Sequence, residues 1–223
     1  MTTKRLLLGA GALLGVLLLG WVALLLFGTT VLPRLGLAPG FALTAEDGRP
    51  LTSEDLRGSL VLYSFAHAGC RSAVCDESAA LLRAVQQRLE EAALRDVPVR
   101  LVTVSVDPAD TPAALQALAR RWGANPVNWA FAAGERETLP RVLRDGFGVH
   151  AERAAGGDWA FDPMFVVVDG WGIVRARYRV GLPAPEFLLR DLRLAAREAR
   201  AASGATRYAY EMAHLFSCAS GGG

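Results

Sequence analysis

Cysteine, histidine and lysine are all scarce in this sequence, and what is missing from it excludes several functions. The 223 residues include three cysteines and three histidines, and Lys4 is the only lysine. With 24 basic and 22 acidic residues the net charge is +2, which gives no indication of a nucleic-acid-binding surface. The Gly-rich segments 156–157 and 170–172 lack the strand-to-helix pattern of a phosphate-binding loop, so nucleotide binding is not supported.

Charged residues are also missing from a long segment near the amino terminus. The run from Leu6 to Phe27 is uncharged and almost wholly apolar, and Lys4 and Arg5 precede it. It exceeds the ~20 residues needed to cross a bilayer, whereas the apolar part of a secretory signal has only ~7–15. No small-residue cleavage site and no lipoprotein cysteine follow. We therefore expect residues 1–28 to be a transmembrane signal anchor with the body of the protein on the extracytoplasmic, periplasmic side; a cleaved signal is the alternative.

Two of the three cysteines stand close together. Cys70 and Cys75 follow the apolar run 60–65, where we expect a buried strand. A turn at the end of a strand exposes side chains while the sheet holds them still, and thiolates are both nucleophiles and ligands for soft metals. The pair therefore predicts redox or metal chemistry, and a structural disulfide in an exported protein is the plainer alternative.

The rest of the pattern predicts an α/β domain. After a tether at residues 29–40, residues 41–203 suffice for one domain, and residues 204–223 form a tail. Strands alternate with helices and an antiparallel hairpin follows, which predicts a thioredoxin-like three-layer fold with a mixed central sheet and helices on both faces. The expected strands are 41–44, 60–65, 97–106, 128–131, 164–168 and 173–180, and the expected helices are 77–94, 110–121, 139–147 and 185–202.

Two details of this expected fold can be tested residue by residue. Pro163 should open the strand that packs beside the cysteine turn, with the cis peptide bond common at that place in such folds. The apolar positions of the last helix predict an inward face made of Phe187, Leu188, Leu192, Leu194 and Ala195.

Two strings of residues resemble one known family. The segment 41–50 followed by Asp55-Leu56-Arg57-Gly58 looks like its opening hairpin, and Val104-Ser105-Val106-Asp107-Pro108 with Asp110-Thr111-Pro112 is the more specific match. On these strings the chain resembles the Sco/SenC proteins from about residue 41 to residue 192. The resemblance implies a membrane-anchored, thioredoxin-like copper chaperone of cytochrome c oxidase assembly. Its partners would be the copper-bearing subunit of the oxidase or the assembly factors of that subunit.

The sequence departs from this family at two places. The resemblance implies three residues between the cysteines and a proline after the first, but here four residues intervene and Arg71 takes the place of the proline. It also implies a copper-binding histidine at the position of Phe161, and a phenylalanine cannot bind a metal. The two thiolates alone can bind Cu(I), and Cu(II) requires an imidazole to complete the site.

A third ligand would have to come from elsewhere in the chain. His67 lies in the same turn as the cysteines, whereas Asp162 offers a carboxylate, which suits Cu(I) poorly. His214 and Cys218 share one face if the tail is helical. Any of the histidines is also compatible with an ordinary surface or packing role. The candidates for a third ligand are His67, His150, Asp162, His214 and Cys218.

Three functions are consistent with this pattern. We predict that the protein binds copper through Cys70 and Cys75 and delivers it during oxidase assembly. A thiol–disulfide oxidoreductase that reduces partner cysteines is the enzymatic alternative, favoured by the altered cysteine spacing and the missing histidine. The third is a non-catalytic assembly protein that kept the fold and lost the site.

Overall fold

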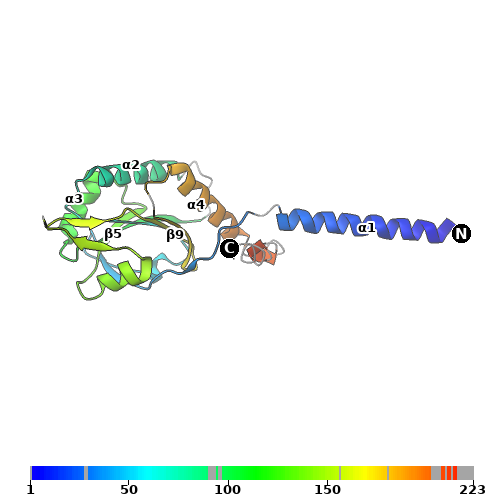
Figure 1. The fold of residues 1–223 in the computed structure, drawn as a ribbon, viewed down its shortest axis with the longest axis horizontal. Coiled ribbons are helices and arrows are strands. Elements are labelled where there is room, and N and C mark those ends of the chain that lie inside the picture. The colour runs from blue at the N-terminus through cyan, green and yellow to red at the C-terminus, as the bar shows by residue number, and fades with distance from the viewer. Residues whose placement is uncertain are drawn as a thin grey trace.

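The apolar N-terminal run forms a helix that projects away from the rest of the molecule (Figure 1). The computed structural model describes residues 2–27, 30–89, 94, 97–155, 157–179, 181–201, 207–208, 210–211 and 213–214. The projecting helix is α1 (Thr2–Phe27), at the place where the sequence predicts a helix. No helix among the described residues is both long and apolar enough to cross a membrane.

A mixed sheet forms the middle layer of the domain, and in the described part of the chain it has eight strands in the order β1-β10-β9-β4-β5-β6-β2-β3. The strands are β1 (Gly36–Leu37), β2 (Ala42–Ala45), β3 (Pro50–Thr52), β4 (Leu60–Ala66), β5 (Val99–Ser105), β6 (Trp129–Ala133), β9 (Phe165–Val168) and β10 (Ile173–Tyr178). β4, β5 and β6 are parallel, and the other neighbours pair antiparallel. Every residue of the central strand β4 is buried, as expected of a strand covered on both faces.

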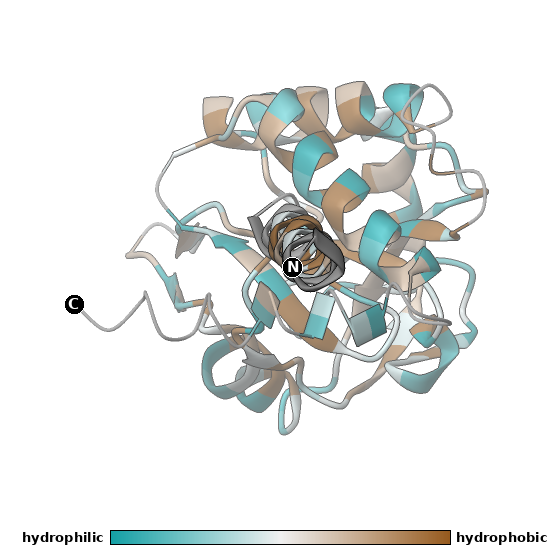
Figure 2. Cartoon of the chain, turned by 90° about the vertical axis from the view of Figure 1, so that its right-hand side faces the viewer, coloured by the Kyte–Doolittle hydropathy of each residue, from teal (hydrophilic) through white to brown (hydrophobic). Residues whose placement is uncertain are grey.

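Helices cover both faces of this sheet. They are α2 (Ala73–Arg88), α3 (Pro112–Trp122), α4 (Pro185–Arg200), the 3-10 turn η1 (Glu54–Leu56) and the π-helix η2 (Arg141–Phe147). The side chains of β4 alternate, so that Leu60 and Leu62 pack with α2, α3 and α4, whereas Val61 and Tyr63 pack with η1 and η2. Figure 1 shows α2, α3 and α4 along one side of the sheet, and Figure 2 shows hydrophilic and hydrophobic residues interleaved along them. The predicted three-layer, mixed-sheet architecture is confirmed.

Two of the detailed expectations are wrong. None of the described peptide bonds is cis, so the bond before Pro163 has the trans form that X–Pro bonds favour by about 0.5–1 kcal/mol. Phe187 does not belong to the inward face of α4, because 50% of its surface is exposed and its ring lies under the guanidinium of Arg190. The buried stripe of α4 runs instead through Leu188, Leu189 and Leu192.

Two features around the cysteines were not foreseen in the sequence. A two-stranded hairpin, β7 (Ala151–Arg153) and β8 (Trp159–Phe161), flanks the segment expected to be only a loop. Strands of three residues are too short to give a hydrophobic period. In addition, α2 begins at Ala73 rather than at residue 77, so Cys75 lies in the first turn of this helix.

The segment expected to be a tether makes specific contacts with the domain. Gly36 and Leu37 form β1, which pairs with β10 at one edge of the sheet. Arg175 of β10 is 1% exposed and donates hydrogen bonds to the carbonyl oxygens of Leu32 (2.7 Å) and Pro33 (3.2 Å). These bonds fix the chain just before it enters the sheet.

Candidate functional site

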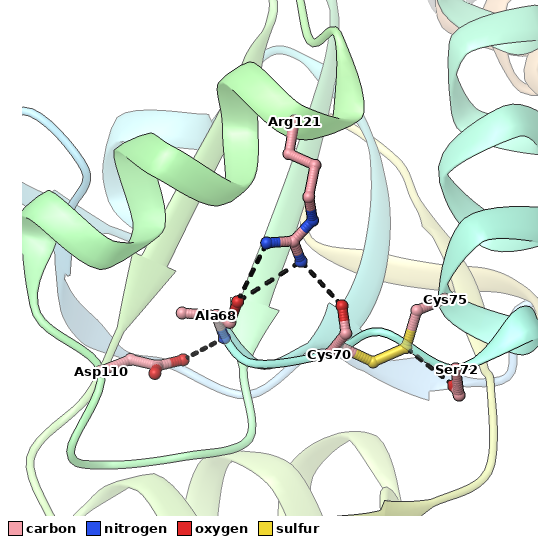
Figure 3. Close-up of a disulfide and its surroundings, with 6 residues drawn as sticks. All are labelled: Ala68, Cys70, Ser72, Cys75, Asp110 and Arg121. Atoms are coloured by element: carbon pink, nitrogen blue, oxygen red, sulfur yellow. Dashed lines mark hydrogen bonds between the residues drawn. A yellow bond between two sulfur atoms is a disulfide. The ribbon is translucent and has the colours of Figure 1, made fainter.

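The two cysteines lie where the central strand passes into α2. β4 ends at Ala66, a short loop follows, and α2 carries Cys75 in its first turn. Cys70 and Cys75 are joined as a disulfide with their Cα atoms 6.1 Å apart, and both side chains are buried (Figure 3). Four intervening residues therefore permit the bond, because the Cα separation falls within the range that a disulfide requires.

Two side chains from outside the cysteine loop hold its backbone (Figure 3). Arg121 of α3 donates to the carbonyl oxygen of Cys70 at 2.7 Å and to that of Ala68 at 3.4 Å. Asp110 accepts from the backbone N–H of Ala68 at 2.7 Å and from the hydroxyl of Ser105 at 2.6 Å. Burial, together with the neighbouring guanidinium of Arg71, lowers the pKa of Arg121.

Asp110 and Arg121 together form a clamp on the cysteine loop, and the sequence contained no indication of it. The expected helix 110–121 placed Asp110 at a helix start, and Thr111 is the N-cap of α3, since its side chain accepts from the N–H of Ala114. The string around Asp110 was recognised, but nothing in it indicated a bond to the cysteine loop. Arg121 carried no signal at all, because its contact joins segments far apart in the chain.

Ser72 makes an unusual contact for a residue that starts a helix. It is the N-cap of α2, but its hydroxyl oxygen accepts no bond from a helix N–H; the hydroxyl instead donates to Sγ of Cys75 at 3.3 Å (Figure 3). A donor beside a sulfur favours the form of that sulfur that carries negative charge. The two sulfurs therefore have different surroundings.

A groove of about 470 Å³ opens over the disulfide. Its lining includes both cysteines, residues of the β7–β8 hairpin and residues beside that hairpin. Among the lining residues are His67, Cys70, Cys75, His150, Phe161 and Asp162. The hairpin brings these segments together, because Phe161 of β8 pairs with Ala151 of β7 directly after His150. Three of the five candidates for a third ligand thus lie on the groove.

The three groove candidates differ in their surroundings. His67 is buried, with 6% of its surface exposed, and its ring meets that of Phe161 edge-on at a centroid distance of 6.1 Å. His150 and Asp162 are exposed. No three histidine, cysteine or acidic side chains of the described residues form a group that could hold a metal ion.

His214 does not line the groove. His214 is buried elsewhere, with Nε2 2.8 Å from Oε1 of Glu198, and Arg175 pairs with that glutamate and with Asp169. Burial alone would raise the pKa of Glu198, but the hydrogen bonds from Arg175 and His214 outweigh it and the pKa is lowered. Cys218 lies outside the described residues. His214 therefore has a structural role in the packed interior, which was the simpler explanation for any of the histidines.

Solved structures share this fold. A SCO1/SenC family lipoprotein from Bacillus anthracis str. Ames matches with a TM-score of 0.67 and 24% identity, covering 75% of this chain and 99% of its own. BsSco, described as a member of the Sco family of cytochrome c oxidase assembly proteins with a disulfide switch, matches at 0.65 and 22%, covering 75% and 98%. Arabidopsis thaliana ScoI with copper bound matches at 0.63 and 17%, covering 73% and 99%.

Sequence comparison gives the family directly. No curated protein matches the chain. A family model described as SCO1/SenC matches residues 33–195, which include the cysteine loop, the strings around Asp110 and the hairpin over the groove. Because this match covers well over half of the sequence and agrees with the fold, the chain belongs to the SCO1/SenC family.

Proposed function

We propose that this protein binds copper through Cys70 and Cys75 and delivers it to the copper-bearing subunit of cytochrome c oxidase. The observation that carries the proposal is the position of the two cysteines, which are bonded to each other and line an open groove. Two soft thiolates so placed form a donor set that suits Cu(I). The groove gives the metal a way in and out, as delivery requires.

Relatives supply further support. The structures with similar folds include ScoI of Arabidopsis thaliana and Sco1 of yeast, both with copper bound. BsSco is described as belonging to a family of cytochrome c oxidase assembly proteins. We carry copper and the oxidase partner to this chain on that basis together with the thiol pair.

Copper loading of the reduced full chain tests the proposal. We expect the wild type to retain about one equivalent of Cu(I) in competition with a chelator, and Cys70→Ser or Cys75→Ser to weaken the affinity at least about tenfold, because each removes a direct ligand. Cys218→Ser is the matched control, since it removes a thiol that the proposal does not use. A wild type without bound Cu(I), or cysteine variants that bind as well as the control, would overturn the proposal.

We also propose that α1 anchors the protein in a membrane, with the domain on the extracytoplasmic side. The uncharged run from Leu6 to Phe27 and the two basic residues before it support this arrangement. The full chain should then stay in the membrane fraction through a wash with alkaline carbonate. Release of the intact chain by that wash would contradict anchoring, and a shortened amino terminus would indicate a cleaved signal.

A second candidate function is thiol–disulfide exchange, and the Cys70–Cys75 disulfide favours it. In this reaction the reduced pair would transfer two electrons to a partner disulfide, so that the partner gains two thiols and the Cys70–Cys75 bond forms. A redox titration tests this role, because a reduction potential far below about −300 mV would indicate a structural disulfide instead. If the double cysteine-to-serine variant supports normal oxidase maturation, the third, non-catalytic hypothesis replaces both.

A further inference from the structure

A second cavity, of about 380 Å³, has neither cysteine in its lining, and we call it the side pocket. Its volume falls within the range of ligand pockets, about 300–1,000 Å³. Val106, Leu139, Leu143 and Val149 line it, and all four are buried, so its floor is apolar. The side pocket can therefore hold an apolar group, and no part of the proposed copper chemistry uses it.

The π-helix η2 and the β7–β8 hairpin together form much of the side pocket. π-helices are rare and frequently lie at functional sites. The hairpin is also part of the cysteine groove, because His150, Glu152 and Trp159 belong to the lining of both cavities. A chain that fills the side pocket can therefore continue over the hairpin into the groove.

The rim of the side pocket carries more positive than negative charge. Arg136 is exposed, and its side chain makes no hydrogen bond or ion pair with any described residue. Arg144 pairs with its exposed neighbour Asp145 at 3.1 Å, a kind of surface pair that contributes little. Glu152 supplies the carboxylate of the lining. Two guanidinium groups against one carboxylate favour an occupant that carries negative charge.

Trp159, in the lining shared by the two cavities, indicates what else the occupant should offer. Its indole N–H is buried and has no hydrogen-bond partner among the described residues. Buried polar groups in native proteins are nearly always hydrogen-bonded, so this exception calls for an explanation. A carbonyl or carboxylate oxygen of an occupant would supply the acceptor. The ring would have to turn toward the cavity, as side chains at interfaces commonly do on binding.

We propose that the side pocket is the docking site for the protein that receives copper from the cysteines, and that it takes a large apolar side chain flanked by an acidic residue of that protein. This inference rests on the proposed function, which supplies the partner. We favour a protein over a free small molecule because the side pocket shares part of its lining with the groove that a copper acceptor must reach.

The two parts of the occupant have different tasks. The apolar side chain would cover the floor at Leu139 and Leu143, and apolar anchors in pockets carry much of the binding energy of protein interfaces. The carboxylate would lie at Arg136, where charge steers the approach and sets the orientation. Docked in this way, the partner's chain would be held across the hairpin with its copper ligands next to the groove.

Titration of the full chain, with and without copper, against the purified copper-bearing subunit of the oxidase tests the inference. Ala151→Phe would place a ring in the cavity, and Arg136→Glu would reverse a charge on its rim. We expect each to raise the Kd for the subunit at least about tenfold. Arg141→Glu is the matched control, because Arg141 is exposed on the same π-helix but does not line the side pocket. The control should bind the subunit like the wild type, and all three variants should keep the wild-type affinity for Cu(I).

The outcomes separate the inference from the proposed function. Unchanged subunit binding in Ala151→Phe and Arg136→Glu would overturn the inference alone, and so would an equal loss in Arg141→Glu. If Ala151→Phe does not fold, the comparison of Arg136→Glu with Arg141→Glu still decides. A wild type that holds no copper but binds the subunit through the side pocket would overturn only the copper proposal. A wild type that holds copper and does not bind the subunit would overturn delivery, and the inference with it.

Discussion

Replacing Asp110 with alanine would remove one half of the clamp on the cysteine loop. Oδ2 of Asp110 accepts from the N–H of Ala68 at 2.7 Å and from the hydroxyl of Ser105 at 2.6 Å. A hydrogen bond to a charged group contributes about 1.5–3 kcal/mol. Ser105 keeps a second acceptor, the carbonyl oxygen of Asp107 at 3.2 Å, so most of the cost falls on the N–H of Ala68. We therefore expect the free energy of unfolding to fall by about 2 kcal/mol.

Thermal unfolding and the rate of disulfide reduction measure this effect. For a domain of this size a loss of about 2 kcal/mol lowers the Tm by about 4–8 °C. The freed loop should also open more often, so dithiothreitol should reduce the Cys70–Cys75 bond faster than in the wild type.

Asp107→Ala is the control for that experiment. Asp107 lies in the same turn, where it accepts from the N–H of Ala109 at 2.8 Å and pairs with Arg153 at 3.3 Å, but it has no bond to the cysteine loop. In the Asp107→Ala variant, dithiothreitol should therefore reduce the Cys70–Cys75 bond at a rate close to that in the wild type. If Asp110→Ala and Asp107→Ala change the rate equally, Asp110 does not act through the loop and the reasoning is refuted.

Three further predictions follow from single contacts. Ser72→Ala should slow reduction of the disulfide about threefold to tenfold, because it removes the donor 3.3 Å from Sγ of Cys75. Ser72→Thr should keep the wild-type rate, and equal rates in the two variants would contradict the prediction. Leu188→Ala should cost about 2–5 kcal/mol in a urea titration because the side chain is fully buried in α4, whereas Phe187→Ala should cost less than about 1 kcal/mol; a similar loss for both would contradict the exposed position of Phe187. Because the pKa of Glu198 is lowered in the folded chain, its contribution to stability is present at neutral pH and should be lost as the pH falls through the range where glutamates titrate. Glu198→Gln should flatten that part of the acid-unfolding curve. An unchanged curve would contradict the assignment.

The central part of the fold was predictable because it follows from local pattern. β4 and β5 are mostly apolar runs, and such runs between helical segments indicate buried, parallel strands. The start of α3 was equally clear, since Thr111 and Pro112 are a typical N-cap and first helical residue. In each case the residues that determine the structure are neighbours in the sequence.

The parts that were missed depend on distant contacts. β7 and β8 have three residues each, and they form a hairpin because they pair with each other, not because of a pattern within either one. The hairpin determines which candidate ligands meet the cysteines. From the sequence, His150 and His214 were equally plausible, and only the folded chain separates the residue on the groove from the one engaged by Glu198.

The clamp and the groove act on different atoms of the same loop, and this explains how the site can tolerate an altered cysteine spacing. On the cysteine loop, Arg121 and Asp110 bond only to backbone atoms, those of Ala68 and Cys70. The side chains of His67 and the two cysteines line the groove. We therefore expect reduction of the disulfide to change the bonding of the sulfurs and to leave the backbone bonds of Arg121 and Asp110 in place. If the backbone bonds persist on reduction, the donors stay pre-positioned, which would lower the cost of assembling the proposed copper site from them. Variants of the clamp should accordingly alter stability and reduction rate, and variants of the groove should alter copper coordination.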